Sequence, residues 1–293
     1  MRLSPRTMTT EMVYIAGGGH SGSTLLEMFV SGAERHHAMG EVFQLVDRRN
    51  PITDHLASHL CSCGNPVEDC VFWGETVNAL QDIPREDENG RYLRIADRFD
   101  AFYGAGHVLI DSSKAPEGLD RAALSGRFDI KVLHLVRDVR PWLVSTGKSY
   151  RRNGVATLRE NVERNGVIKG SAKYLMRNPY VDARKWLSLN AEVQRVITRH
   201  GLQALRVSYE RLCFDTEAVK REIEAFIGVE IAGYGIEGTR QRNHSIFGNR
   251  MRFEPEKLAR IRYDNSWFHD NCWLLPYVVS PRLRRMNRQL QQR

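Results

Sequence analysis

A glycine-rich stretch near the N-terminus of the sequence has the residue types of an anion-binding turn. The apolar residues 12–16 predict a β-strand, and the apolar spacing over residues 25–30 predicts an amphipathic helix. Between them, residues 17–24 read Gly-Gly-Gly-His-Ser-Gly-Ser-Thr. Glycines let the backbone turn so that several N–H groups point inward, and the start of a helix adds unpaired donors. The pattern therefore predicts a loop that binds a phosphate-like anion.

The same stretch fits the frame of the P-loop motif G-x-x-x-x-G-K-[ST] at all but one position. Gly17 and Gly22 stand at the two glycine positions, but Ser23 takes the place of the lysine, and Thr24 follows it. In nucleoside triphosphatases that lysine neutralises the β- and γ-phosphates. Its absence favours an anionic ligand other than ATP or GTP. The alternative interpretation is an ordinary glycine turn between a strand and a helix.

Three further apolar runs predict strands at residues 107–111, 130–136 and 204–208, with helical segments between them. This alternation predicts a three-layer α/β/α fold with a central, mostly parallel sheet. Ligands of such sheets bind at the carboxyl ends of the strands. The candidate site residues therefore follow the strands, at positions 17–24, 111–114 and 137–140.

Two polar residues near the third of these strand ends can contact one anionic group. Arg137 directly follows the predicted strand, and Ser145 lies two turns into the next helix. A guanidinium can make charge-assisted, bidentate hydrogen bonds to a phosphate, and a hydroxyl adds one more donor. Residues 148–185 are also rich in Arg and Lys, which fits either a solvated surface or a lid over an anionic ligand.

Length and composition set broad limits on the chain. Its 293 residues are enough for one large α/β domain, and we expect a single domain over 1–293 with lid or acceptor-pocket insertions at about 41–100 and 150–185. The net charge of +8 favours an anionic ligand or partner. No run of apolar residues predicts a membrane span or a secretory signal. Five cysteines fit a reducing, cytoplasmic location better than a disulfide scaffold.

Three separated segments resemble those of the sulfotransferases that use 3′-phosphoadenosine-5′-phosphosulfate (PAPS). His20-Ser-Gly-Ser-Thr24 resembles the family's loop for the 5′-phosphosulfate. Arg137 with Ser145 resembles the segment that holds the 3′-phosphate, and Val207-Ser-Tyr-Glu-Arg-Leu212 resembles a later strand and helix start. The stretch Gly248-Asn-Arg-Met-Arg is similar to a closing loop over the 3′-phosphate, although that match is looser.

This resemblance implies a PAPS-dependent sulfotransferase with the family's P-loop-like fold. Such an enzyme transfers a sulfuryl group in line to a hydroxyl or amine, requires no metal, and releases adenosine 3′,5′-bisphosphate. We expect a small-molecule acceptor and no nucleic-acid partner, and the sequence is compatible with a homodimer. The cofactor-binding positions that the resemblance implies are Gly19, His20, Ser21, Gly22, Ser23, Thr24, Arg137, Ser145, Tyr209, Asn249 and Arg250.

The resemblance also implies three catalytic candidates. Gly40-Glu41 is similar to a pair found in several relatives, including tyrosylprotein sulfotransferases, in which the glutamate is the proposed base. His20 stands where the family often has a lysine or arginine, and its ring can donate a hydrogen bond to the leaving oxygen. Lys114 is the alternative cation for the leaving group. The reserve candidates for the base are His107, Asp111 and His134.

Cysteines gather in one short segment. Cys61, Cys63 and Cys70 with His59 form a candidate zinc set, but the spacing C-x-C-x₆-C is not one of the usual zinc spacings. We favour a lid whose packing depends on the apolar residues 71–73, and predict no bound metal. A metal site and a disulfide remain as alternatives.

Three other functions are compatible with parts of the sequence. A P-loop nucleotide kinase or NTPase would use Asp111 as its acidic residue, but Ser23 in place of lysine argues against it. A non-catalytic nucleotide-binding relative is the second, because His20 departs from the family's pattern. A basic nucleic-acid-binding module is the third, but the basic residues are dispersed and no base-reading motif is present.

Overall fold

The computed structural model describes residues 9–50, 56, 59–152, 158–159, 162–163, 167, 178–232, 242–253 and 261–292. Most of the segment expected as a second lid, at about 150–185, lies outside these residues. Within the described part of the chain, no helix is long and apolar enough to cross a bilayer.

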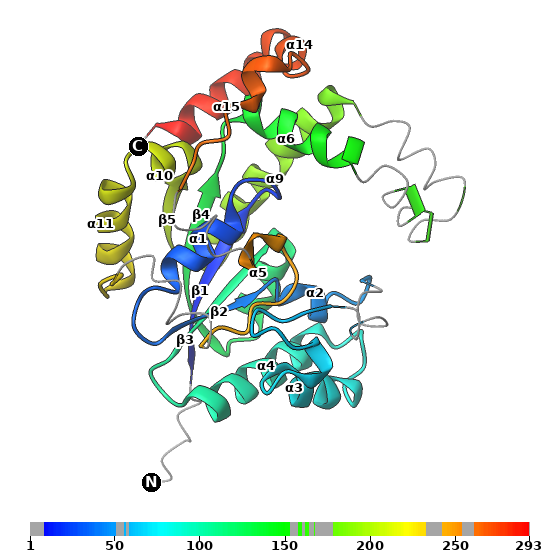
Figure 1. Cartoon of the computed structure of the whole chain (residues 1–293), viewed down its shortest axis with the longest axis vertical. Helices are drawn as coiled ribbons and strands as arrows, with labels where there is room; N and C mark the ends of the chain where they lie inside the picture. The colour runs from blue at the N-terminus through cyan, green and yellow to red at the C-terminus, as the bar shows by residue number, and fades with distance from the viewer. Residues whose placement is uncertain are drawn as a thin grey trace.

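Strands and helices alternate along the chain, as Figure 1 shows. The strands are β1 (Thr10–Gly17), β2 (His36–Gly40), β3 (Val108–Lys114), β4 (Phe128–Val136) and β5 (Gln203–Ser208). The α-helices are α1 (Ser23–Val30), α2 (Phe43–Val46), α3 (Trp73–Gln81), α4 (Glu88–Tyr103), α5 (Pro116–Leu124), α6 (Val139–Arg152), α9 (Pro179–His200), α10 (Tyr209–Phe214), α11 (Thr216–Ile227), α14 (Leu274–Val279) and α15 (Pro281–Gln291). Short 3₁₀ helices are η3 (Val67–Asp69), η4 (Arg250–Phe253) and η5 (Ser266–His269).

The five strands form one sheet in the order β2-β3-β1-β4-β5, and every neighbouring pair is parallel. β1 is the central strand, and Tyr14 on it stands opposite Asp111 of β3 and Val132 of β4. Side chains alternate across a strand, so β1 packs against helices on both sides. Met12, Tyr14 and Ala16 belong to the core on one face. Val13 and Ile15 belong to the core on the other face.

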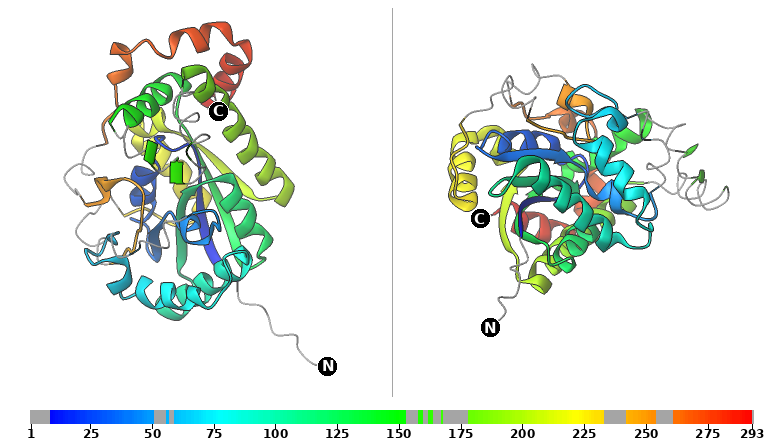
Figure 2. Two further views of the ribbon diagram at one scale, coloured as in Figure 1. Left: turned by 90° about the vertical axis from the view of Figure 1, so that its right-hand side faces the viewer. Right: turned by 90° about the horizontal axis from the view of Figure 1, so that it is seen from below.

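Helices cover both faces of the sheet (Figures 1 and 2). α2 to α5 and α9 pack on the face of Tyr14, and α1, α10 and α11 pack on the opposite face. The C-terminal helices α14 and α15 lie together at the top of Figure 1. α15 contacts α6 and α9 through a third apolar cluster that includes Trp142, Trp186 and Leu283. The α/β fold with a parallel sheet between helical layers is therefore confirmed.

The sequence interpretation missed one strand and one helix, and placed the start of another helix too late. β2 was not predicted, because its sequence His-His-Ala-Met-Gly has no apolar alternation. α3 was not predicted. The sequence predicts a surface loop over residues 82–91 and a helix over residues 92–102, whereas α4 already begins at Glu88. The Asp87 side chain caps α4 by accepting a hydrogen bond from Gly90 N. β3 also continues to Lys114, so residues 111–114 lie in the strand and do not follow it.

The outer edge of β2 pairs with a distant segment of the chain. His244 N donates to Ala38 O at 3.0 Å, and Ile246 N donates to Met39 O at 3.2 Å. Gly40 and Ile246 form a parallel bridge. A Cβ atom on Gly40 would stand 2.0 Å from Ile246 O, so only glycine permits this close approach. The pairing places residues 242–253 beside the carboxyl end of the sheet.

Candidate functional site

The loop between β1 and α1 has the backbone geometry of an anion-binding turn. Gly17 has φ 151°, and a Cβ atom there would stand 2.2 Å from Leu135 O. Gly22 precedes α1 with φ 94°, and a Cβ atom there would stand 2.7 Å from the Tyr209 ring. Both glycines of the motif are therefore required sterically. No side-chain hydrogen bond caps the N-terminus of α1 within the described residues, so its first N–H groups face the loop.

A cavity of about 590 Å³ lies beside this loop. That volume is within the usual range for small-molecule sites. Of the residues expected to bind the cofactor, six line the cavity: His20, Gly22, Arg137, Ser145, Tyr209 and Asn249. Five lining residues were not predicted: Leu25, Met251, Ile261, Arg262 and Asp264. The second group comes partly from the segment after residue 260, which carries no motif that we recognise.

Arg137 is the central cation of the cavity wall. It follows β4 and is 5% exposed. Its Nη1 donates to His20 O at 2.8 Å, and its guanidinium lies 4.7 Å above the Tyr209 ring. Its Nε is buried and has no hydrogen-bond partner among the described residues. A buried guanidinium nitrogen without a partner is unfavourable unless a ligand supplies an acceptor.

One acid shares this wall. Asp264 Oδ2 accepts a hydrogen bond from Arg137 Nη2 at 3.1 Å. Burial would raise the pKa of Asp264, but hydrogen bonds from Ser266 and Arg137 hold that pKa below its ordinary value. Asp264 is therefore ionised at neutral pH, and its side chain remains 42% exposed. It is the counter-ion of Arg137.

The loop itself is fixed by contacts with α6 and β4. Trp142 Nε1 donates to Gly19 O at 2.7 Å, and Ser21 N donates to Gly18 O at 3.3 Å. His20 lies between these contacts with φ 65°, is exposed, and lines the cavity. Ser21 and Ser23 are buried and Thr24 is half-buried, and none of the three is a lining residue of the cavity. Arg250 is exposed at the start of η4 and also lies outside the cavity lining.

A second charged group lies beside the first turn of α1. Lys114 Nζ forms a close ion pair with Glu41 Oε1, and Gln44 Nε2 donates to Glu41 Oε2. Both charged side chains are largely buried, at 16% and 13% exposure. A Cβ atom on Gly248 would stand 3.1 Å from Glu41 Oε1 and 3.7 Å from Thr24 Oγ1. Two of the predicted catalytic residues therefore meet next to Thr24, while the third, His20, lines the cavity.

Left-handed backbone conformations gather around this region. Within the described residues, four non-glycine residues have positive φ, and three of them are His20 (65°), Lys114 (67°) and Phe247 (60°). Such conformations are unfavourable for side-chain-bearing residues and are concentrated at functional sites. His20 lies in the glycine-rich loop, and Lys114 belongs to the ion pair with Glu41. Phe247 lies in the segment 242–253 that pairs with β2.

Glu27 is a buried acid that sequence reasoning missed. It lies on α1 and is 2% exposed. Its Oε1 accepts from Gly40 N at 2.7 Å and from Ser245 Oγ at 3.2 Å, and its Oε2 accepts from Ser112 Oγ at 3.0 Å. One carboxyl thus joins α1 to β2, to β3 and to the segment beside β2. The sequence signal that could have identified it is an acidic residue within an apolar helical stripe, between Leu26 and Phe29.

The three reserve candidates for a base lie elsewhere. His134 on β4 is buried against Asn190 Oδ1 at 3.0 Å, and burial lowers the pKa of its ring to about 4. His107 precedes β3 and its Nδ1 lies 2.7 Å from His37 Nε2, at the amino end of the sheet. Asp111 is fully buried, and burial raises its pKa to about 7 against hydrogen bonds from Ser113 and Tyr92. None of the three lines the cavity.

Comparisons with known proteins add little to this geometry. No family model matches the chain, and no curated protein matches it. Among the solved structures to which the chain is similar is the sulfotransferase domain from the Synechococcus PCC 7002 olefin synthase. The identity is 17%, the TM-score is 0.43, and the alignment covers 99% of this chain and 91% of that chain. A similarity at this level carries no argument about function, so the function must be inferred from the residues themselves.

We predict that the Glu27 carboxyl makes the stability of the protein depend on pH. Burial raises the pKa of Glu27 from 4.5 to about 7 in the folded chain, so folding favours the protonated form. This contribution is fully present below the unfolded-state pKa and is lost as the pH rises through the folded-state value. In Glu27→Gln the titrating group is absent. The free energy of unfolding of Glu27→Gln, relative to wild type, should therefore rise by up to roughly 3 kcal/mol from acid to neutral pH.

Urea denaturation of both proteins at several pH values between about 4.5 and 8 measures this difference. Glu68→Gln, which changes an exposed glutamate, is the control for the loss of one negative charge. A stability difference between Glu27→Gln and wild type that stays constant across the range would contradict the assignment.

Proposed function

We propose that this protein is a PAPS-dependent sulfotransferase, in which the cavity binds the nucleotide and the Glu41–Lys114 pair marks the transfer site. The observation that carries the proposal is the meeting of a lysine-free P-loop turn with a buried arginine in one cavity. The arginine, Arg137, has a nitrogen without a partner among the described residues. A triphosphate would need the missing lysine, whereas a nucleotide with a separate 3′-phosphate needs a cation away from the loop. Arg137 supplies that cation.

The 3′-phosphate is assigned to Arg137 and Ser145. Both residues line the cavity, and Tyr209 packs against the guanidinium from the other side. An incoming phosphate can take the place of Asp264 as acceptor for Arg137 Nη2 and can accept from the buried Nε as well. Asn249 on the closing side of the cavity offers an amide donor. The exposed Arg250 next to it adds positive charge near the cavity mouth.

The 5′-phosphosulfate is assigned to residues 19–24. Backbone N–H groups of the turn and of the first turn of α1 are the donors, and Ser23 and Thr24 add hydroxyls. The sulfuryl group then lies near Thr24, and Glu41 and Lys114 lie on the neighbouring side. No step requires a metal ion. The acceptor is a hydroxyl or amine of a small molecule.

In the transfer step, the acceptor oxygen bonds to sulfur as the bond between sulfur and the bridging phosphate oxygen breaks. Glu41 takes the proton of the acceptor hydroxyl, because its carboxylate lies beside Thr24, where it is paired with Lys114. Negative charge develops on the departing phosphate oxygen, and Lys114 and the loop N–H groups stabilise it. His20 lines the nucleotide cavity, and its ring donates a further hydrogen bond to the departing phosphate oxygen.

We predict that Arg137→Ala weakens binding of adenosine 3′,5′-bisphosphate on the order of 10- to 100-fold. Binding of 5′-AMP, which lacks the 3′-phosphate, should change much less. Isothermal titration calorimetry measures both ligands. Ser145→Ala should show the same selectivity with a smaller loss, and Arg206→Ala, an exposed arginine on β5, is the matched control. Equal losses for the two ligands in Arg137→Ala would mean that the arginine shapes the loop but does not contact the 3′-phosphate.

We predict that Glu41→Gln retains cofactor binding and loses turnover. The amide has the size of the carboxylate but cannot accept the acceptor's proton, so the turnover rate should fall by a factor on the order of 10² to 10⁴. The measurement is transfer of labelled sulfate from PAPS to an acceptor found in a screen of hydroxylated and amine-bearing small molecules. Glu68→Gln is the control. Near-normal turnover in Glu41→Gln would remove Glu41 from the mechanism.

A further inference from the structure

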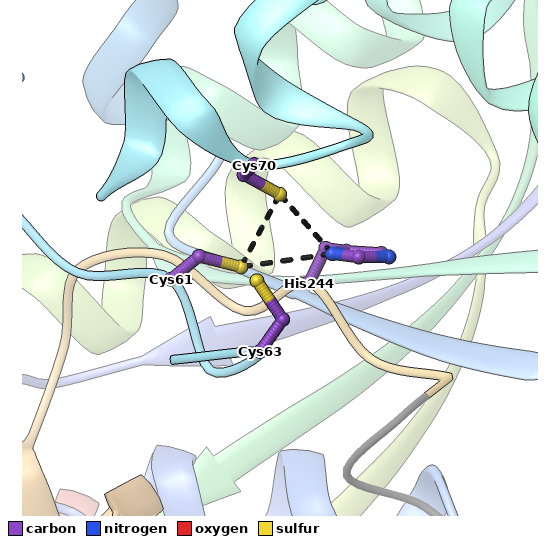
Figure 3. A group of neighbouring side chains, drawn as sticks. All are labelled: Cys61, Cys63, Cys70 and His244. Carbon is purple, nitrogen blue, oxygen red and sulfur yellow. Dashed lines mark hydrogen bonds between the residues drawn. The ribbon is translucent and has the colours of Figure 1, made fainter. Parts of the chain in front are cut away.

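Four metal-ligating side chains converge outside the proposed active site. Cys61, Cys63, Cys70 and His244 point toward one another, as Figure 3 shows. Their three sulfurs and one ring nitrogen all lie within 4.8 Å of one another. Cys61, Cys70 and His244 are buried and Cys63 is half-buried. His59, the fourth residue of the zinc set that the sequence suggested, does not belong to this group; His244 occupies that place.

The spacing of these atoms fits a tetrahedral zinc site. Zinc bonds of about 2.3 Å to sulfur and 2.0–2.1 Å to nitrogen place neighbouring ligand atoms about 3.6–3.8 Å apart. Cys61 Sγ lies 3.6 Å from Cys70 Sγ and 3.7 Å from His244 Nδ1. Cys70 Sγ lies 3.2 Å from His244 Nδ1. These three edges therefore differ from those of a tetrahedron by a few tenths of an ångström, and Cys63 Sγ lies within 4.8 Å of the other three ligand atoms.

The backbone around the ligands is held in place by independent hydrogen bonds. Ser62 N donates to Ser245 O at 2.9 Å, and Ser245 N donates to Ser62 Oγ at 2.8 Å. Trp73 Nε1 donates to His244 O. These contacts join the cysteine loop to the segment that carries the histidine, although 183 residues separate Cys61 from His244. The ligands are thus brought together by the fold and not by a local motif.

The surroundings of the ligands also suit a metal–thiolate centre. Trp73 N donates to Cys70 Sγ at 3.5 Å, and such N–H donors stabilise a thiolate. The Phe72 ring stacks on the His244 ring, with centroids 5.9 Å apart, and so helps to fix its orientation. Three thiolates and one imidazole are the ligands of structural zinc sites, and a full set of four leaves no open position for catalysis.

We propose that Cys61, Cys63, Cys70 and His244 bind one zinc ion, which stabilises the packing of residues 59–73 against residues 243–247. This proposal departs from our expectation of a metal-free lid. It also has a consequence for the cavity, because His244 lies five residues before Asn249 in a segment that pairs with β2. The ion therefore fixes the chain that leads into the cavity wall. The proposal does not depend on the sulfotransferase assignment.

The test is the zinc content of the full chain after purification without chelators. We expect one zinc per chain by inductively coupled plasma mass spectrometry, and no stoichiometric iron or copper. Cys70→Ser and His244→Ala should lose the ion, whereas His244→Cys should retain it, because four thiolates also form a closed tetrahedral set. Cys272→Ser, which changes a half-buried cysteine outside the cluster, should bind zinc as the wild type does. Zinc removal should also lower the melting temperature.

Titration of thiols in the denatured, chelated, non-reduced protein separates the alternatives. Five reactive thiols together with one released zinc support the site. Three thiols and no zinc would show a disulfide in place of the metal and overturn the proposal. Five thiols with no zinc bound, even after incubation of the reduced protein with excess Zn²⁺, would overturn it as well. If His244→Ala fails to fold, retention of zinc by His244→Cys together with its loss from Cys70→Ser still tests the ligand set.

Discussion

One hydrogen bond joins the two loops on which the cavity depends. Arg137, the first residue after β4, donates to the carbonyl of His20 in the turn after β1. This contact is possible because all five strands are parallel, so the loops that leave their carboxyl ends meet at one edge. The same guanidinium stacks on Tyr209, the first residue after β5. A single buried cation thus positions the turn and one wall of the cavity, and its Nε has no partner among the described residues.

The other wall comes from a segment that pairs with the edge of the sheet. Residues 242–253 lie beside β2 and are held there by backbone hydrogen bonds and by Glu27, whose carboxyl also contacts β3. Arg252 of this segment is buried and donates to Leu60 O at 3.1 Å. The proposed zinc ion lies at the start of this segment, and Asn249 at the cavity lies near its end. The stability of this edge and the shape of the cavity are therefore coupled.

Much of the fold and part of the site could be predicted from the sequence, for physical reasons. β1, β3, β4 and β5 are apolar runs with strand periodicity. A glycine-rich turn between a strand and a helix can adopt only a few backbone conformations. Arg137 was predicted because it follows a strand whose carboxyl end lies at the binding edge of the sheet, and Ser145 because it lies two turns into the next helix. Tyr209 was implied only by the family resemblance. In contrast, β2 carries two histidines and a glycine, and its burial comes from tertiary contacts.

The remaining features depend on contacts between distant residues. His244 reaches Cys70 across 174 residues, and no local spacing encodes that distance. Asp264 reaches Arg137 across 127 residues, from a segment without a recognisable motif. Glu27 looks like an interruption of an apolar helix until its three hydrogen-bond donors are seen. Such residues become identifiable only when the fold brings their partners together.

The central claim is that the cavity binds a nucleotide with a 3′-phosphate and not a nucleoside triphosphate. Calorimetric titration of the wild-type protein with adenosine 3′,5′-bisphosphate and, separately, with ATP and Mg²⁺ tests it most directly. We expect the bisphosphate to bind at least an order of magnitude more tightly, because the proposed site pairs Arg137 with the 3′-phosphate while the loop lacks the lysine that triphosphates need. Tighter binding of ATP with Mg²⁺, or no binding of the bisphosphate, would contradict the account.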